Sequence, residues 1–128
     1  MRTHYIVALS MLSGAVVGSA VVQALHAQAK PLLYQIPEIE VLDPAAYIKE
    51  YAPRGRASIQ QYGGRFIALG GKTTSIEGEP PKARIAIIAW DSIDKLQAYW
   101  NSAEFKEIKP IRDKYARFRT FTVEGASN

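Results

Sequence analysis

Four segments of the chain show the hydrophobic patterns that are typical of β-strands. They are residues 34–41, 65–69, 83–90 and 120–124. The first and the last alternate apolar with polar residues, which predicts strands with one face against a core. The two middle segments are apolar on both faces, which predicts strands that are covered on both sides. Pro37 lies inside the first segment and favours an edge or bulged position for it, because proline cannot donate a ladder hydrogen bond.

A first helical region is predicted between the first two strands. Asp43 followed by Pro44 is typical of a helix N-cap and first turn. Helical spacing gives this region one apolar face, which we expect to be buried and which consists of Tyr47, Ile48 and Tyr51. Pro53 and Gly55 are expected to interrupt the helix before it resumes, and the glycine pair ahead of the second strand ends it.

A second helical region is predicted after the third strand. Ser92 is placed to cap a helix over residues 93–100. Asn101 and Glu104 then fit a capping box for a further helix, in which Pro110 is expected to produce a kink. The resulting element order, βαββαβ, predicts a ferredoxin-like α+β sandwich, with residues 30–128 as a single domain.

The predicted sheet has more apolar surface than its helices can cover. In the third strand Ile85 and Ile87 point to one side, whereas Ile88 and Trp90 point to the other. Helices on one face leave the opposite apolar face exposed to water, which is unusual for an antiparallel sheet. We therefore expect a homodimer that packs through the sheet faces.

The N-terminal segment has the features of a secretory leader. Residues 3–29 carry no formally charged side chain and follow Arg2, and residues 5–22 form an apolar run. Ala27 and Ala29 flank Gln28 in a small-x-small pattern, which predicts a signal peptide in residues 1–29 that is cleaved after Ala29 or Ala27. The alternative is an uncleaved membrane anchor. Both place the domain outside the cytoplasm, in the periplasm or secreted, with membrane contact only in the second case.

The composition narrows the chemistry of the remaining chain. There is no cysteine, and all histidines and methionines lie in the leader, at Met1, His4, Met11 and His26. Residues 30–128 therefore lack the usual ligands of zinc, copper and haem, and we expect no metal site and no cofactor. An enzyme on this domain would be independent of cofactors and would act without histidine or cysteine.

Several short motifs together resemble a known family. Its pieces are Asp43-Pro44, Tyr47 with Tyr51, Tyr62-Gly63-Gly64-Arg65-Phe66, Gly70-Gly71, Glu77-Gly78, Ser102 with Glu104, Arg112 and Val123-Glu124-Gly125. In order and spacing they are similar to the domain-of-unknown-function 1330 family, over about residues 34 to 125. The resemblance implies a ferredoxin-like protomer and a dimeric α+β barrel, and it brings no catalytic residues with it.

Aromatic and cationic residues are predicted to meet near one end of the sheet. The candidate ligand-binding residues are Tyr47, Tyr51, Tyr62, Arg65, Trp90, Trp100 and Arg112. Arginine binds carboxylates through two parallel hydrogen bonds, and aromatic rings supply a flat apolar wall. This set therefore suits a small aromatic or carboxylated ligand, and Glu77 is the candidate base if the pocket is catalytic. The alternative is a structural or interaction homodimer in which these aromatic residues form only the core.

The C-terminal part of the chain is rich in basic residues. The last helix is expected to carry Lys106, Lys109, Arg112, Lys114, Arg117 and Arg119. Such a face can bind nucleic acid or anionic lipid. Because the leader predicts export, we expect a solvated helix face and no nucleic-acid partner.

Overall fold

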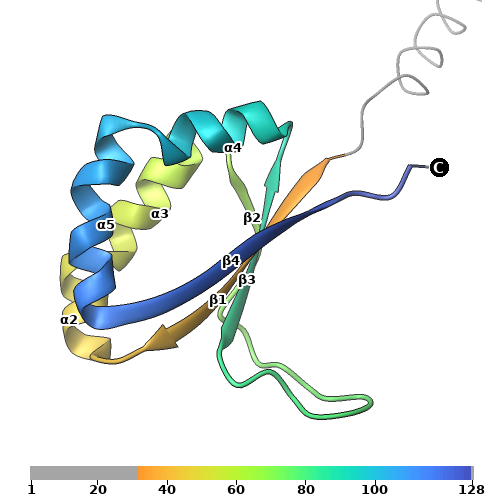
Figure 1. Cartoon of the computed structure of the whole chain (residues 1–128). Helices are drawn as coiled ribbons and strands as arrows, with labels where there is room; N and C mark the ends of the chain where they lie inside the picture. The colour runs from red at the N-terminus through yellow and green to blue at the C-terminus, as the bar shows by residue number, and fades with distance from the viewer. Residues whose placement is uncertain (1–31, 128) are drawn as a thin grey trace, which may run out of the picture. The chain divides into compact units, whose positions relative to one another are not determined.

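The computed structural model describes residues 32–127, and the predicted leader with its cleavage sites at Ala27 and Ala29 lies outside them. The elements follow in the order β1 (Leu33–Val41), α2 (Pro44–Glu50), α3 (Ala52–Gln61), β2 (Arg65–Leu69), β3 (Arg84–Trp90), α4 (Ile93–Trp100), α5 (Ala103–Tyr115) and β4 (Ala116–Glu124). The strands form one antiparallel sheet in the order β2-β3-β1-β4, and all the helices cover the same face of it (Figure 1). This is the ferredoxin-like α+β fold that the sequence predicts.

The first strand lies in the centre of the sheet, so the expectation of an edge position for it is wrong. β1 pairs with β4 along its whole length, whereas its pairing with β3 omits Ile36 and Pro37. Because proline has no N–H to donate, the strand tolerates Pro37 by losing part of one ladder. The middle of β1 is therefore paired with β4 on one side only.

The first helical region breaks at Tyr51, ahead of the expected position. A proline ring clashes with the carbonyl four residues earlier, so Pro53 requires the helix to end before it, and α3 restarts with Pro53 in its first turn. Gly55 is buried inside α3 and does not interrupt it. Tyr47 and Tyr51 point toward the core, but Ile48 is 60% exposed, which corrects its assignment to the buried face.

Side-chain caps fix the starts of three helices. Asp43 and Ser92 accept from the backbone N–H groups of Ala46 and Lys95, as predicted. The cap of α5 is Ser102, whose Oγ accepts from Phe105 N at 3.1 Å. Asn101 is not this cap, because it forms the C-terminal end of α4 while Ser102 takes the extended backbone of an N-cap.

The last strand begins at Ala116, four residues earlier than expected. Ala116 and Phe118 contact the core, whereas Arg117 and Arg119 lie on the other face of β4. The two arginines therefore do not belong to the basic helix, which ends at Tyr115. Their alternation with apolar neighbours is a strand pattern that the high charge of this region obscured.

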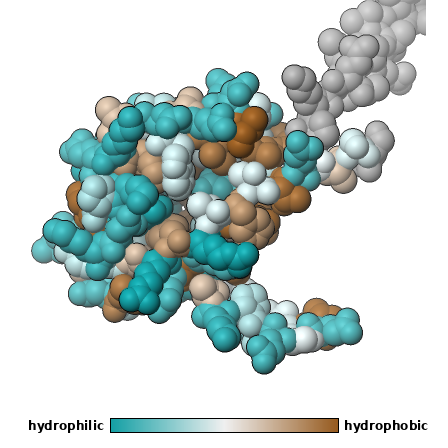
Figure 2. Space-filling view, in the orientation of Figure 1, coloured by the Kyte–Doolittle hydropathy of each residue, from teal (hydrophilic) through white to brown (hydrophobic). Residues whose placement is uncertain are grey.

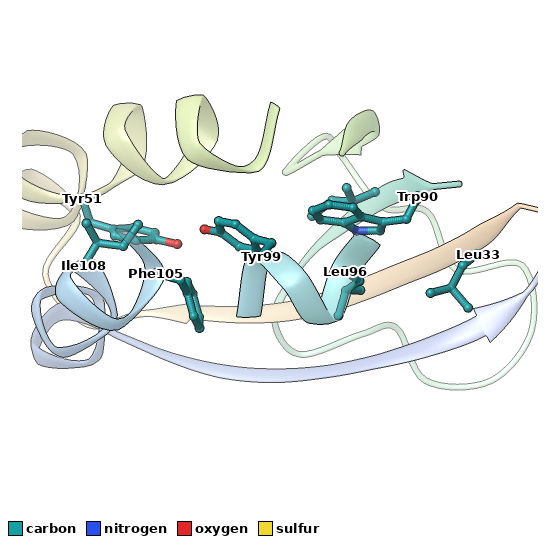
Figure 3. Packing of buried hydrophobic residues seen from close by; sticks show 8 residues of the cluster. Leu33, Tyr51, Trp90, Leu96, Tyr99, Phe105 and Ile108 are labelled. Atoms are coloured by element: carbon teal, nitrogen blue, oxygen red, sulfur yellow. The ribbon is translucent and has the colours of Figure 1, made fainter. Parts of the chain in front are cut away.

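The core fills the space between the helices and the inner face of the sheet, which we define as the face that the helices cover. Figure 3 shows its main cluster, which consists of Leu33, Tyr51, Ile88, Trp90, Leu96, Tyr99, Phe105 and Ile108. Trp90 and Tyr99 are almost completely buried and stack with ring centroids 5.9 Å apart. None of the helices in residues 32–127 is long and apolar enough to cross a membrane.

The opposite, outer face of the sheet carries no helix (Figure 1). Several of its apolar side chains are open to solvent, with Ile67 60%, Val123 50% and Phe121 41% exposed. Ile85 and Ile87 are half-buried between the strands. Both faces of the sheet are thus apolar in part, as the pattern of the third strand predicts.

The loop between β2 and β3 projects from the body on the outer side of the sheet (Figure 1). It contains Ile76, which is 94% exposed, and the Ser75 hydroxyl donates to the Gly78 carbonyl at 2.6 Å near its tip. Figure 2 shows hydrophobic residues on the side of the body from which this loop projects. The loop and the outer face thus lie on the same side of the domain.

Candidate functional site

A cleft of about 730 Å³ lies between the helices and the inner face of the sheet, with wall residues from α2, α3, α4 and α5 and from every strand. It contains four of the predicted ligand-binding residues, Tyr47, Tyr51, Trp100 and Arg112. This volume is in the range of small-molecule sites. The cleft is therefore large enough for a ligand of the predicted class.

Arg112 is the buried charge of the cleft. Its side chain is 7% exposed, and its guanidinium lies 4.1 Å from the centre of the Phe118 ring and 5.5 Å from that of Phe105. Its Nε donates to Asp113 at 3.0 Å, and Asp113 also accepts from Lys109 at 2.7 Å. The bond to Asp113 uses Nε and leaves the two terminal amino groups for Tyr51 and the cleft. Since Lys109 shares the carboxylate, the cluster keeps a net positive charge.

Asp113 is an ionised carboxylate at neutral pH. Partial burial acts to raise its pKa, but the hydrogen bonds and charges of Lys109 and Arg112 outweigh burial and hold the pKa below its usual value. The side chain is 43% exposed, so water solvates the remaining charge. Arg112 therefore has one carboxylate partner, which is partly exposed to solvent and is not among the wall residues of the cleft.

Tyr47 and Tyr51 add two phenols beside Arg112. Their ring centroids are 5.4 Å apart, and both rings contact Phe118. Burial raises the pKa of Tyr47 to about 12, an effect that Tyr51 reinforces and Arg112 opposes. Burial also raises the pKa of Tyr51, although the charge of Arg112 and a hydrogen bond from it oppose the shift. Both hydroxyls are therefore protonated donors at neutral pH.

The hydroxyls of Tyr51 and Tyr99 point toward one another in the core (Figure 3). Only the hydroxyl proton of Tyr99 is already donated to another side chain of the protein. Ser58 Oγ donates its single proton to the Gly55 carbonyl, so the 2.8 Å contact between Ser58 Oγ and Tyr99 must be donated by Tyr99. Because the Tyr51 oxygen accepts from Arg112, its own proton remains free to donate. Arg112 and Tyr51 together thus offer a group of donors to the cleft.

The remaining charges of the cleft wall are mainly positive. Arg56, Lys82 and Arg84 join Arg112, whereas Glu40 is the only acidic residue of the wall. Within residues 32–127, the first three form no ion pair with a carboxylate. The electrostatic character of the cleft therefore favours an anion.

Four of the predicted site residues do not line the cleft. Tyr62 and Trp90 pack in the core behind it. Arg65 lies on the outer side of β2, exposed and 3.1 Å from Asp91. Glu77 is exposed in the projecting loop. The structure thus separates the two predicted arginines, because α5 faces the core whereas Arg65 points away from it.

The structure adds residues that the sequence patterns did not single out. Gln35 and Thr120 are polar residues on the inner face of the sheet, and both line the cleft. Trp90 Nε1 donates to Gln35 Oε1 at 3.0 Å, and Gln35 Nε2 donates to Thr120 Oγ1 at 3.1 Å. The signal for Gln35 is its place in β1, where it is the one polar residue among the buried inward positions.

The described part of the chain offers no cluster of metal-ligating side chains. Among residues 32–127 there is no group of three or more histidine, cysteine, aspartate or glutamate side chains that could hold a metal ion. The polar side chains of the cleft wall are tyrosines, arginines, one lysine, one glutamine, one threonine and a single carboxylate, Glu40.

Fold and cleft together define a ferredoxin-like α+β protein with a ligand-sized cleft between its helices and its sheet. The family model described as domain of unknown function, DUF1330, matches residues 33–126. The chain therefore belongs to the DUF1330 family, as its motifs predicted. No curated protein matches the chain.

Solved structures of low sequence identity share this fold. One is a conserved protein of unknown function and possible oxidoreductase from Bacteroides thetaiotaomicron VPI-5482, which is 14% identical. The alignment covers 75% of this chain and 99% of that one, with a TM-score of 0.54. Another is the methylated RPA0582 protein of Rhodopseudomonas palustris, also 14% identical, with 84% and 90% of the two chains covered and a TM-score of 0.56. At this identity the likeness concerns the fold alone.

Proposed function

We propose that the protein binds a small organic acid, with an aromatic or other flat apolar body, in the cleft between helices and sheet. The observation that carries the proposal is the burial of Arg112 between Phe118 and Phe105, with a single carboxylate partner that it shares. Burying a charge is costly unless it is fully paired. A ligand carboxylate at the terminal amino groups would complete the pairing through two parallel hydrogen bonds.

The surroundings of Arg112 support a carboxylate more than a neutral ligand. The Tyr51 hydroxyl can donate to the same oxygen atoms, and the cationic wall residues attract an anion toward the opening. Trp100, Tyr47 and Phe118 provide apolar surface for the rest of the molecule. We assign binding to this cleft and no reaction.

Benzoate titration tests this proposal. We expect benzoate to bind the wild-type protein and Arg112→Met to lose about 10- to 100-fold in affinity, the range for hydrogen bonds to a charged group. Arg65→Ala is the matched control, since it removes an arginine that lies outside the cleft. If titration calorimetry shows equal affinity for wild type and Arg112→Met, Arg112 is not the anchor and the structural alternative is favoured.

We also propose that two copies pack through the outer faces of their sheets. The uncovered apolar residues of this face and the exposed Ile76 of the projecting loop support the proposal. A second copy would cover the face, and each loop would reach past the sheet edge toward the partner. Light scattering of residues 30–128 is expected to give twice the chain mass, and a monomer mass would overturn the proposal.

Export remains a proposal that rests on the leader pattern in residues 1–29. We propose that the domain acts in the periplasm or outside the cell. Expression of the full chain in a bacterium, followed by fractionation and N-terminal sequencing, is expected to give an exported product that begins at Lys30 or Gln28. A product in the cytoplasm that retains Met1 would contradict it.

A further inference from the structure

The polar chain Trp90–Gln35–Thr120 ends at the cleft in hydrogen-bond donors without an acceptor. An indole N–H can only donate, so the Gln35 atom that faces Trp90 must be the carbonyl oxygen. The orientation of the Gln35 amide is therefore fixed by chemistry, and its NH₂ group points to the other side, toward β4.

The hydrogen bonds of the two polar side chains leave two protons unused. One N–H of Gln35 is donated to Thr120 Oγ1, and the second has no acceptor within residues 32–127. The Thr120 hydroxyl accepts this bond, and its own proton has no protein acceptor in the same part of the chain. Both side chains line the cleft and also border the smaller cavity beside it, and Gln35 is only 6% exposed. One buried and one half-buried side chain at this spot therefore each keep a proton without an acceptor in residues 32–127.

The strand geometry gives the approximate separation between these two polar side chains and the Arg112 guanidinium. Thr120 follows Phe118 by two residues on the same face of β4, and the Arg112 guanidinium lies on the Phe118 ring. Two residues along a strand span about 7 Å, which is close to the length of a para-substituted benzene ring.

We propose that Gln35 and Thr120 form a second, neutral subsite that takes an uncharged oxygen acceptor of the ligand. Resting on the proposed carboxylate function, this inference narrows the ligand class: an organic acid with a carbonyl-type oxygen about one ring length from its carboxylate. Trp90 is a positioning residue, because it holds the Gln35 amide in the donating orientation. The two subsites then distinguish the two ends of the ligand.

Two probes of similar shape test the subsite. They are 4-acetylbenzoate, which carries the acceptor, and 4-isopropylbenzoate, which does not. We expect the wild-type protein to bind 4-acetylbenzoate roughly three- to tenfold more tightly, the value of one net hydrogen bond. Gln35→Met and Thr120→Val are expected to bring this ratio close to one while 4-isopropylbenzoate still binds.

Thr122→Val is the matched control for Thr120→Val, because Thr122 lies further along the same strand but does not line the cleft; it lines only the smaller neighbouring cavity, which Gln35 and Thr120 also border. We expect it to keep the wild-type ratio. Should Gln35→Met fold poorly, Thr120→Val alone decides, since it removes only a hydroxyl group. In NMR spectra of the wild type, 4-acetylbenzoate is also expected to shift the indole N–H signal of Trp90 more than 4-isopropylbenzoate does.

The outcomes separate the two proposals. Equal affinities of the wild type for both probes, with binding still dependent on Arg112, would overturn the neutral subsite and leave the carboxylate site standing. A preference for 4-acetylbenzoate that persists in both variants would also overturn the subsite. If neither probe nor benzoate binds the wild type, both proposals fail.

Discussion

The two faces of the sheet come from the same four strands but treat polar and apolar groups in opposite ways. On the inner face the apolar residues are buried, and the polar side chain of Gln35 is buried with them, as is Arg112 on the helix that covers this face. On the outer face the charged side chains pair in solvent, as Arg119 does with Glu38, and the apolar residues are the ones left exposed. Buried polar groups on the inner face point to a small ligand, whereas exposed apolar groups on the outer face point to a protein partner.

A charge on the outer face is expected to have the largest effect. In Ile87→Asp, a carboxylate would be buried in the proposed dimer contact, and we expect the protein to become a monomer while its circular dichroism stays that of a folded chain. Ile48→Asp is the control, since Ile48 is 60% exposed on the helical side. Light scattering distinguishes the masses, and a dimeric Ile87→Asp protein would show that the outer face is not the interface.

The next largest effect is expected from a change in the packing between the helices and the core, at Gly55 in α3. A Cβ added at Gly55 would lie 2.5 Å from the Tyr51 ring, so Gly55→Ala forces a shift and is expected to cost about 1–2 kcal/mol of unfolding free energy even though alanine favours helices. Gly71→Ala is the control, because nothing lies within 4 Å of its added carbon. Urea denaturation measures the difference, and equal losses would show that the tight inner packing is not what Gly55 serves.

Alkaline pH is expected to lower the free energy of unfolding more gradually, through the buried tyrosines of the core. Burial raises the pKa of Tyr47 and of Tyr99 to about 12, from 10.0 in the unfolded chain. The unfolded state thus loses its phenolic protons first, so the free energy of unfolding should be constant below about pH 10 and fall between pH 10 and 12. Denaturation curves across this range measure the slope, and Tyr99→Phe should make it shallower. An unchanged slope in this variant would contradict the assignment.

The smallest effect is expected for the stability of Arg112→Met without ligand. Removal of one partner from an ion pair is costly when the other charge is left buried and unpaired, but Asp113 is 43% exposed and keeps its bond to Lys109. If Arg112 serves a ligand, the variant should stay within about 1 kcal/mol of wild type in urea denaturation, whereas an arginine that holds the core together would cost about 3–5 kcal/mol. A large loss of unfolding free energy would therefore show that Arg112 stabilises the core and does not serve a ligand.

The sequence predicted the fold well because the fold depends on patterns that are local. Alternation in β1 and the apolar run of β3 place the strands, and Asp43 and Ser92 mark helix starts through their own backbone contacts. The errors lie where two patterns compete. Arg117 and Arg119 continue a run of charges that began in α5 but alternate as a strand does.

The site was predictable only in part, because its members come from distant elements. Tyr47, Tyr51 and Arg112 lie beside one another, as predicted, since Tyr47 and Arg112 lie on the core-facing sides of α2 and α5 and Tyr51 points inward from the break between α2 and α3. The orientation of Arg65 depends on the pairing of β2 with β3, including the irregularity between Phe66 and Ala68. No local pattern reveals this pairing, nor that Trp90 would orient the amide of Gln35.

The contact between Gly55 and Tyr51 has a consequence for the kinetics of recognition. The hydroxyl end of the Tyr51 ring packs against α3 at Gly55, where the Cβ of any other residue would lie within 3 Å of it. A ring confined in this way has little rotational freedom to lose, so its hydroxyl is already oriented when a ligand arrives. Binding to such a preorganised donor costs little conformational entropy. Differences in affinity between ligands should then appear mainly in their dissociation rates.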